Sequence, residues 1–122
     1  MHVLDLTFFG KRYKNVARAS QLLLLYLMIC DEKNDISATK TQLIEIYDKV
    51  FGVALPRRTL SDWIKILAEN GAIKYKYSGS ARLNPFFYYH GDADNYDDVV
   101  NDYNEFVSAI PMTEFDQDDK SA

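Results

Sequence analysis

Basic side chains stand at the starts of two predicted helices, and these residues are the best placed in the chain to do chemistry. Arg57 and Arg58 begin one helix, and Lys40 and Thr41 begin the helix before it. An arginine donates two parallel hydrogen bonds to a guanine edge or to a phosphate, and helix N-termini attract anions. The pattern therefore favours binding of a polyanion over a chemical reaction.

The residues needed for other chemistries are missing or scattered. His2, His90 and the single cysteine, Cys30, are isolated in the sequence and form no zinc-ligand pattern. The sequence contains neither a glycine-rich phosphate loop nor the pattern of a nucleophile with its base. The acidic stretch DADNYDD lacks the glycine and the glutamate of a calcium loop. We therefore expect a protein without enzymatic activity, metal or cofactor.

The net charge of −4 conceals two regions of opposite sign. Residues 1–90 contain 13 basic and 8 acidic residues, a balance of +5, whereas residues 91–122 contain one basic and 10 acidic residues, a balance of −9. A basic body that carries an acidic tail is typical of proteins that bind a polyanion through the body.

Length and composition fit one domain in a reducing compartment. The chain has 122 residues, 48% of them hydrophobic, which is enough for one core. A lone cysteine excludes an internal disulfide. The longest apolar run, residues 22–30, is too short to span a bilayer, and the N-terminus lacks the pattern of a secretion signal. We expect a cytoplasmic protein.

Two capped helices joined by a short link must position the basic residues. Thr39 and Gln42 have the spacing of a capping box, and Gly52 ends that helix. Pro56 suits the first turn of the next helix, which we predict over residues 57–70 before Gly71. Its expected apolar face consists of Leu60, Trp63, Ile64 and Leu67. The opposite face then carries Arg57, Arg58, Ser61, Asp62 and Lys65. Trp63 is expected in the core rather than stacked on a base.

A hairpin follows directly. The stretches AIKYKY and ARLNPFFYY flank a Ser-Gly-Ser turn and predict two strands, the second broken at Pro85. Lys74, Lys76 and Arg82 lie on the expected outward face. The aromatic residues 86–89 could form a stacking platform for single-stranded nucleic acid, but we expect them to pack against the last helix.

The remaining segments complete the predicted organisation. Residues 1–16 form an N-terminal arm or strand, and residues 17–30 form a helix buried nearly all round. Residues 36–38 form a short strand. Residues 92–110 hold a linker and a helix over 96–109, and residues 111–122 form an acidic tail expected to be disordered.

The order of elements predicts a mainly α-helical fold with a small β-hairpin, arranged as a winged helix-turn-helix over residues 17–91 with an additional C-terminal helix. In such a fold the second helix enters the major groove, where its N-terminal residues reach base edges. Here that recognition helix is 57–70. The wing, residues 74–82, would lie on the phosphate backbone or in the minor groove.

The same residues resemble a known family. The segments SQLLLLYLM, ATKTQLIEIY and RRTLSDWIKILAENGAIKY resemble the three-helix core of winged-helix DNA-binding proteins. The end of the recognition helix carries the pattern of that superfamily in Ile64, Leu67, Gly71 and Ile73. The stretch ARLNPFFYYHGD resembles plasmid replication initiators of the RepL type and related proteins of mobile elements. The resemblance spans about residues 17–91. It implies that Arg57, Arg58, Ser61 and Lys65 face the major groove and that Lys74, Lys76 and Arg82 lie on the wing.

Two functions follow as hypotheses. The first is a sequence-specific double-stranded DNA-binding protein of a plasmid or phage, acting in replication initiation or transcriptional control. We expect a homodimer, formed through the N-terminal arm or through the last helix with Val99, Tyr103, Phe106 and Val107, unless that helix packs on its own domain. The second is a winged-helix adaptor whose acidic tail binds a basic protein partner. The candidate DNA contacts are Lys40, Thr41, Arg57, Arg58, Ser61, Lys65, Lys74, Lys76 and Arg82.

Overall fold

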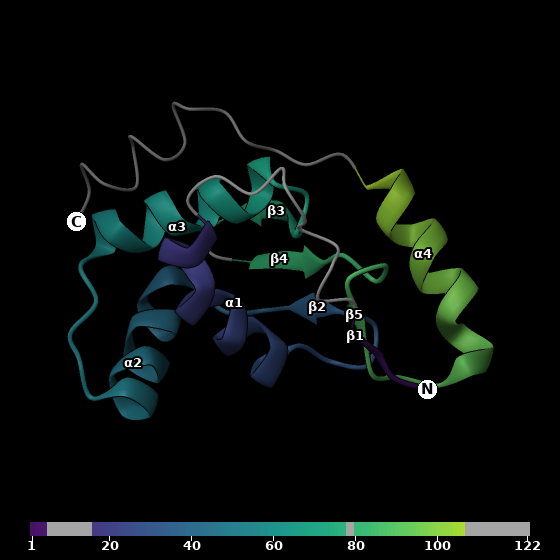
Figure 1. Cartoon of the computed structure of the whole chain (residues 1–122), viewed down its shortest axis with the longest axis horizontal. Helices are drawn as coiled ribbons and strands as arrows, with labels where there is room; N and C mark the ends of the chain where they lie inside the picture. The colour runs from purple at the N-terminus through teal and green to yellow at the C-terminus, as the bar shows by residue number, and fades with distance from the viewer. Residues whose placement is uncertain (5–15, 78–79, 107–122) are drawn as a thin grey trace.

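The computed structural model describes residues 1–4, 16–77 and 80–106 (Figure 1). The side chains of residues 3, 16–18 and 76–77 are not described. Most of the predicted N-terminal arm, the wing tip and the acidic tail therefore lie outside the described residues. The helices are α1 (Val16–Ile29), α2 (Lys40–Phe51), α3 (Arg57–Glu69) and α4 (Tyr96–Glu105), with a 3-10 turn, η2 (Ala93–Asn95), before α4. The strands are β1 (Val3–Leu4), β2 (Asp35–Ile36), β3 (Ile73–Tyr77), β4 (Ser80–Leu83) and β5 (Tyr88–Tyr89).

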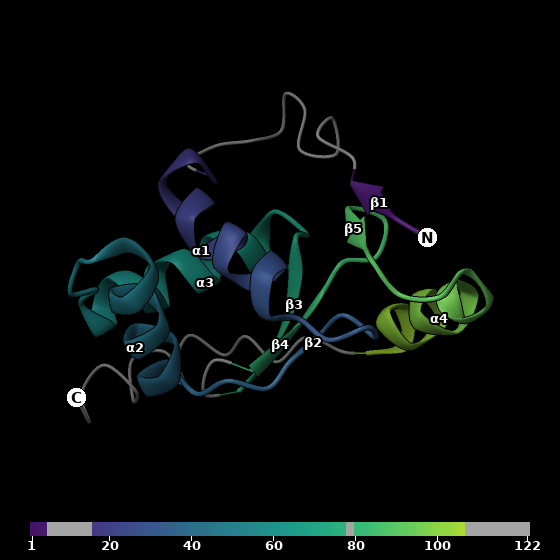
Figure 2. The same ribbon diagram turned by 90° about the horizontal axis from the view of Figure 1, so that it is seen from below.

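The described chain is a mixed α/β fold with four helices and a small antiparallel sheet. α1, α2 and α3 gather at one end of the molecule and α4 at the other, with the sheet between them (Figures 1 and 2). The three strands have the order β2-β4-β3, so the strand before α2 pairs with the second strand of the hairpin. A separate two-stranded ladder joins β1 to β5.

The register of the sheet divides its residues between two faces. Ala81 on the central strand pairs with Ile36 on one side and Tyr75 on the other, and all three are buried. Arg82, one residue further, pairs with Asp35 and Lys74. Because side chains alternate along a strand, the apolar set faces α1 and α3, and the charged set lies on the opposite face of the sheet.

The core lies where α1 packs across α3 and the inner face of the sheet. Leu22, Leu25 and Tyr26 of α1 have no exposed surface, and neither do Leu60, Ile64 and Leu67 of α3. Trp63 is half-buried against the core, with its ring 6.0 Å from that of Tyr47. The expectation that α1 is buried nearly all round is wrong, because Leu24 and Met28 are exposed. Cys30 is buried, and burial raises the pKa of its thiol to about 11, so it stays protonated at neutral pH.

The predicted capping box at the start of α2 and the predicted glycine stop of α3 are confirmed. The Gln42 amide N–H donates to Oγ1 of Thr39 over 3.1 Å, and the Thr39 amide N–H donates to Oε1 of Gln42 over 2.9 Å, which closes the capping box. At the end of α3, Gly71 adopts φ +77°, a conformation that glycine reaches without steric cost. The Gly71 and Ala72 amides then donate to carbonyls of the last helical turn, as in a Schellman motif.

The hairpin is also confirmed, including the break at Pro85. Asn84 ends β4, and its side chain donates to the Gly71 carbonyl over 2.9 Å and accepts from the Phe86 amide over 2.9 Å. The chain turns there and continues as β5, where the Tyr89 ring meets the edge of the Tyr96 ring of α4 at 5.1 Å. The aromatic run therefore packs against the last helix at Tyr89, while Phe86 remains exposed. α4 ends at Glu105, before the predicted end at 109.

Sequence reasoning did not identify Asn34, which connects β4 to β5. Its φ of +65° places it in the left-handed region, and its buried amide donates to the Leu83 carbonyl over 3.1 Å and to the Tyr88 carbonyl over 2.6 Å. Asparagine tolerates this backbone conformation better than most residues do. The residue therefore sets both the turn after α1 and the path of the chain from β4 into β5.

We predict that Asn34→Ala lowers the free energy of unfolding by about 2–4 kcal/mol, because it removes two buried hydrogen bonds and strains the backbone. Asn34→Gly keeps the backbone relaxed and should cost about 1–2 kcal/mol. Urea unfolding of both variants measures the difference. Equal losses for alanine and glycine would contradict the backbone contribution.

Candidate nucleic-acid interface

The N-terminus of α3 lies at the predicted basic face, and no side chain caps it. Pro56 is the N-cap residue rather than part of the first turn, and it supplies no side-chain hydrogen bond to the helix. The first amide groups of a helix lack intrahelical acceptors, so this end retains its partial positive charge. Arg57 and Arg58 occupy the first two helical positions, and Arg58 is exposed.

Arg57 joins the start of α3 to the start of α2. Its Nη1 donates to Oγ1 of Thr41 over 3.3 Å. Its Nε is buried and has no hydrogen-bond partner among the described residues. Thr41 is exposed in the first turn of α2. The structure thus brings three of the predicted contact residues, Thr41, Arg57 and Arg58, together in one surface, which we call the α2–α3 surface.

Lys40 and Ser61 do not belong to the exposed part of this surface. They are 1% and 2% exposed, and the Lys40 ammonium donates to Oγ of Ser61 over 2.9 Å. Lys40 shares the inward face of α2 with Leu43 and Tyr47, which follow it at i+3 and i+7. The prediction that Lys40 and Ser61 contact DNA from the outer face is therefore corrected. Their side chains connect α2 to α3 beneath the basic residues.

The third turn of α3 carries a weaker positive charge. Nζ of Lys65 lies 3.8 Å from Oε1 of Glu69, and the two side chains are 32% and 58% exposed. Such exposed i, i+4 pairs contribute about 0.3–0.5 kcal/mol, so Lys65 is easily released to another anion. Arg58 and Asp62 are both exposed, and within the described chain they form no ion pair with each other.

The wing residues Lys74 and Arg82 bind the last helix of the same chain. The Lys74 ammonium donates to the carbonyls of Tyr103 over 2.6 Å and of Phe106 over 2.9 Å, and it lies 4.6 Å from the centre of the Tyr103 ring. Cations are favourable at a helix C-terminus because the carbonyls there have no intrahelical donors. Lys74 therefore caps α4.

Arg82 holds the same end of α4 from the neighbouring strand. Its Nη1 donates to the Asp102 carbonyl over 3.3 Å, and its guanidinium lies 5.1 Å from the centre of the Phe106 ring. Its Nε is 2.9 Å from Oδ1 of Asp35 on β2. The expectation that Lys74 and Arg82 project freely from the wing is wrong, because α4 ends on the outer face of the sheet. The side chain of Lys76 lies outside the described part of the chain.

The apolar stripe of α4 is used within the domain. Val99 and Tyr103 are buried, and the Tyr103 hydroxyl donates to the Gly71 carbonyl over 3.4 Å. Phe106 is half-buried, and Val107 lies beyond the described residues. Of the two roles considered for this helix, dimerisation and packing on its own domain, the contacts support packing.

The described residues contain no group of three or more His, Cys, Asp or Glu side chains that could hold a metal ion. Over the same residues, no helix is both long and apolar enough to cross a membrane. No protein-family model, no curated protein and no solved structure significantly matches the chain.

We predict that Lys74→Met lowers the free energy of unfolding by about 1.5–3 kcal/mol, because hydrogen bonds from a charged donor to the α4 carbonyls are lost. The methionine retains most of the apolar side chain. Lys33→Met, at an exposed position of the turn after α1, is the matched control and should change stability by less than about 0.5 kcal/mol. Equal urea midpoints for the two variants would show that the cap contributes nothing.

Proposed function

We propose that this chain is a winged helix-turn-helix protein that binds double-stranded DNA sequence-specifically, with α3 in the major groove. The arrangement of α2, α3 and the hairpin, and the sheet order β2-β4-β3, support the winged-helix assignment. The DNA-binding proposal rests mainly on one contact between the first turns of α2 and α3. Arg57 of α3 donates to Thr41 of α2, and the neighbouring Arg58 is exposed.

The side chains of the α2–α3 surface suit different contacts. Arg58 is exposed at the second position of α3, so its guanidinium is free to read a base edge such as guanine O6 and N7. Arg57 is half-buried and donates to Thr41 through Nη1, and a guanidinium has further N–H donors that suit a phosphate. Lys65 would contact a phosphate two turns further along. Lys40 and Ser61 then act by fixing the helices, and Lys74 and Arg82 by fixing α4.

The biological role follows from the sequence resemblance and remains part of the proposal. The protein would act in the cytoplasm at a plasmid or phage origin, in replication initiation, or at a promoter, in transcriptional control. A single recognition helix reads only a few base pairs, so two copies on a repeated or palindromic site are expected.

A protein–protein adaptor is the second candidate, and the surface of α4 favours it. Residues 92–105 contain no lysine or arginine. Six carboxylates in and beside α4 are exposed, namely Asp92, Asp94, Asp97, Asp98, Asp102 and Glu105. Together with the acidic tail they would attract a basic protein. An adaptor predicts no shift of duplex DNA at low salt, whereas phosphate contacts predict binding that falls steeply as salt rises.

We predict that Arg57→Ala combined with Arg58→Ala weakens specific DNA binding at least about 30-fold, since each arginine contact contributes roughly 1–3 kcal/mol. Gel shifts with a duplex enriched from a random-oligonucleotide pool measure the loss, and a native circular dichroism spectrum confirms the fold. Lys33→Ala removes an exposed charge outside the α2–α3 surface and is the control. Unchanged affinity of the double variant would remove both arginines from the interface.

Deletion of residues 112–122 should strengthen DNA binding, because it removes four carboxylates and one lysine and so relieves repulsion from the phosphates. Fluorescence anisotropy at two salt concentrations measures the change. The gain should be larger at low salt, where charges are screened less. Weaker binding after the deletion would mean that the tail assists the complex.

A further inference from the structure

The exposed stripe of α3 alternates in charge. It consists of Arg58, Asp62, Lys65 and Glu69, which follow one another with helical spacing along one side of the helix. Arg58, Asp62 and Glu69 are exposed, and the side chain of Lys65 is 32% exposed. The helix proposed to enter the major groove therefore presents two carboxylates among its cations.

The two carboxylates of this stripe differ in their partners. Oε1 of Glu69 lies 3.8 Å from Nζ of Lys65, four residues earlier, so this pair offsets its own charges. Asp62 follows Arg58 with the same spacing, yet within the described chain the two form no ion pair. The Asp62 carboxylate is therefore open to another hydrogen-bond donor. Facing a phosphate backbone it would be unfavourable, because like charges repel.

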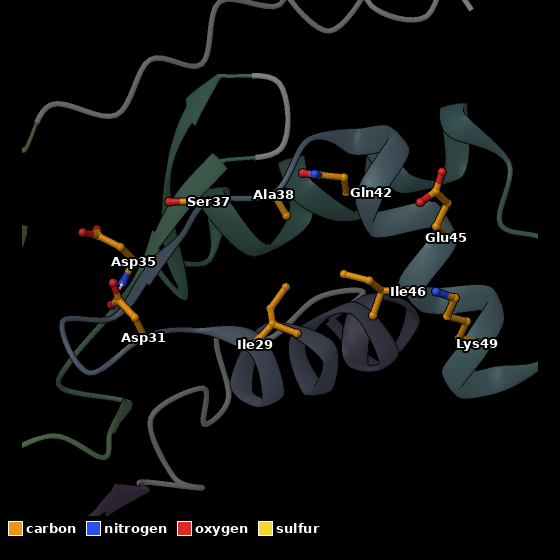
Figure 3. A pocket seen from close by; sticks show the side chains of 9 residues that line it. All are labelled: Ile29, Asp31, Asp35, Ser37, Ala38, Gln42, Glu45, Ile46 and Lys49. Atoms are coloured by element: carbon orange, nitrogen blue, oxygen red, sulfur yellow. Dashed lines mark hydrogen bonds between the residues drawn. The ribbon is translucent and has the colours of Figure 1, made fainter.

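Three other carboxylates near the helices belong to different elements. Asp31, Asp35 and Glu45 line a pocket of about 400 Å³ between the end of α1, β2 and α2 (Figure 3). Oδ1 of Asp31 accepts from the amides of Lys33 and Asp35, each over 2.9 Å, and Asp35 forms the ion pair with Arg82. Glu45 is exposed on α2. Because Glu45 lies outside α3, its substitution provides a control for the charge of Asp62.

We propose that Asp62 determines sequence specificity by accepting a hydrogen bond from the N4 amino group of a cytosine in the major groove. This role rests on the proposed function, in which α3 lies in that groove. A carboxylate only accepts hydrogen bonds, and guanine and thymine present acceptors and no donor there. Adenine presents a donor beside its acceptor N7, whereas the cytosine edge presents a donor alone. The Asp62 carboxylate therefore favours cytosine over the other three bases.

Asp62 and Arg58 would read different base pairs. Four residues of an α-helix advance about 6 Å, and stacked base pairs are about 3.4 Å apart, so the two side chains reach positions up to about two base pairs apart. Arg58 then selects a guanine and Asp62 selects a cytosine. Because the carboxylate also repels phosphates, binding to unrelated sequences is weakened, while the matched site gains a hydrogen bond. The ratio of specific to nonspecific affinity therefore rises.

Enrichment of duplexes from a random-oligonucleotide pool by the full chain, followed by sequencing, tests the proposal. The wild type should favour cytosine at one position by at least about fivefold, the usual discrimination at one base pair. Asp62→Ala should lose that preference and keep the rest of the motif. Asp62→Asn should change the preference to adenine, because an amide bonds N6 and N7 of adenine together. Affinity for unrelated duplex should rise for both variants.

Two further variants separate base reading from charge and from an effect through Arg58. Glu45→Gln removes one carboxylate from α2 and should keep every base preference, and Arg58→Ala should relax the guanine position alone. Circular dichroism confirms that each variant is folded. An Asp62→Ala variant that enriches the wild-type motif, or that relaxes the same base pair as Arg58→Ala, would overturn the role of Asp62 and leave the proposed function standing. A wild type that enriches no motif would overturn both.

Discussion

The hydrogen bond from the Lys40 ammonium to the Ser61 hydroxyl determines how α2 meets α3. A buried ammonium is costly unless it is hydrogen-bonded, so the two helices are constrained to keep these atoms together. That constraint places Thr41, next to Lys40, within reach of Arg57, one turn before Ser61. The surface proposed to bind DNA is therefore built on a polar contact beneath it, and the core residues Leu60 and Ile64 hold α3 from the other side.

The positive charges of the chain divide into two groups by the acceptors they meet. Lys74 and Arg82 use backbone carbonyls at the end of α4, which leaves them committed to the fold. Arg57, Arg58 and Lys65 have solvent or weak partners, so anions can reach them. The acidic surface of α4 stands at the end of the molecule opposite α1–α3 (Figure 1). Because the basic and acidic surfaces lie at opposite ends, a bound polyanion would contact the α2–α3 surface, and α4 would point away from it.

Local signals predicted most of the elements, because each depends on neighbouring residues. The capping box at Thr39 and the glycine after α3 act within one helical turn, and the hairpin follows from alternation around a short turn. The inward position of Lys40 could also have been predicted from the sequence, because Lys40 precedes Leu43 and Tyr47 with helical spacing. The hydrogen bonds of Lys74 could not be predicted from the sequence, because the carbonyls that accept them lie 29 or more residues away, at the end of α4. The pairing of β1 with β5 and the bonds of Asn34 are equally non-local.

In the proposed complex, the starts of α2 and α3 form one DNA-contacting surface. A titration of isotope-labelled protein with a duplex enriched from a random-oligonucleotide pool, followed by backbone amide chemical shifts, tests it most directly. We predict that the largest changes fall on Thr41, Arg57 and Arg58 and fade as salt is raised. Changes confined to α4, or no changes at low salt, would contradict the claim.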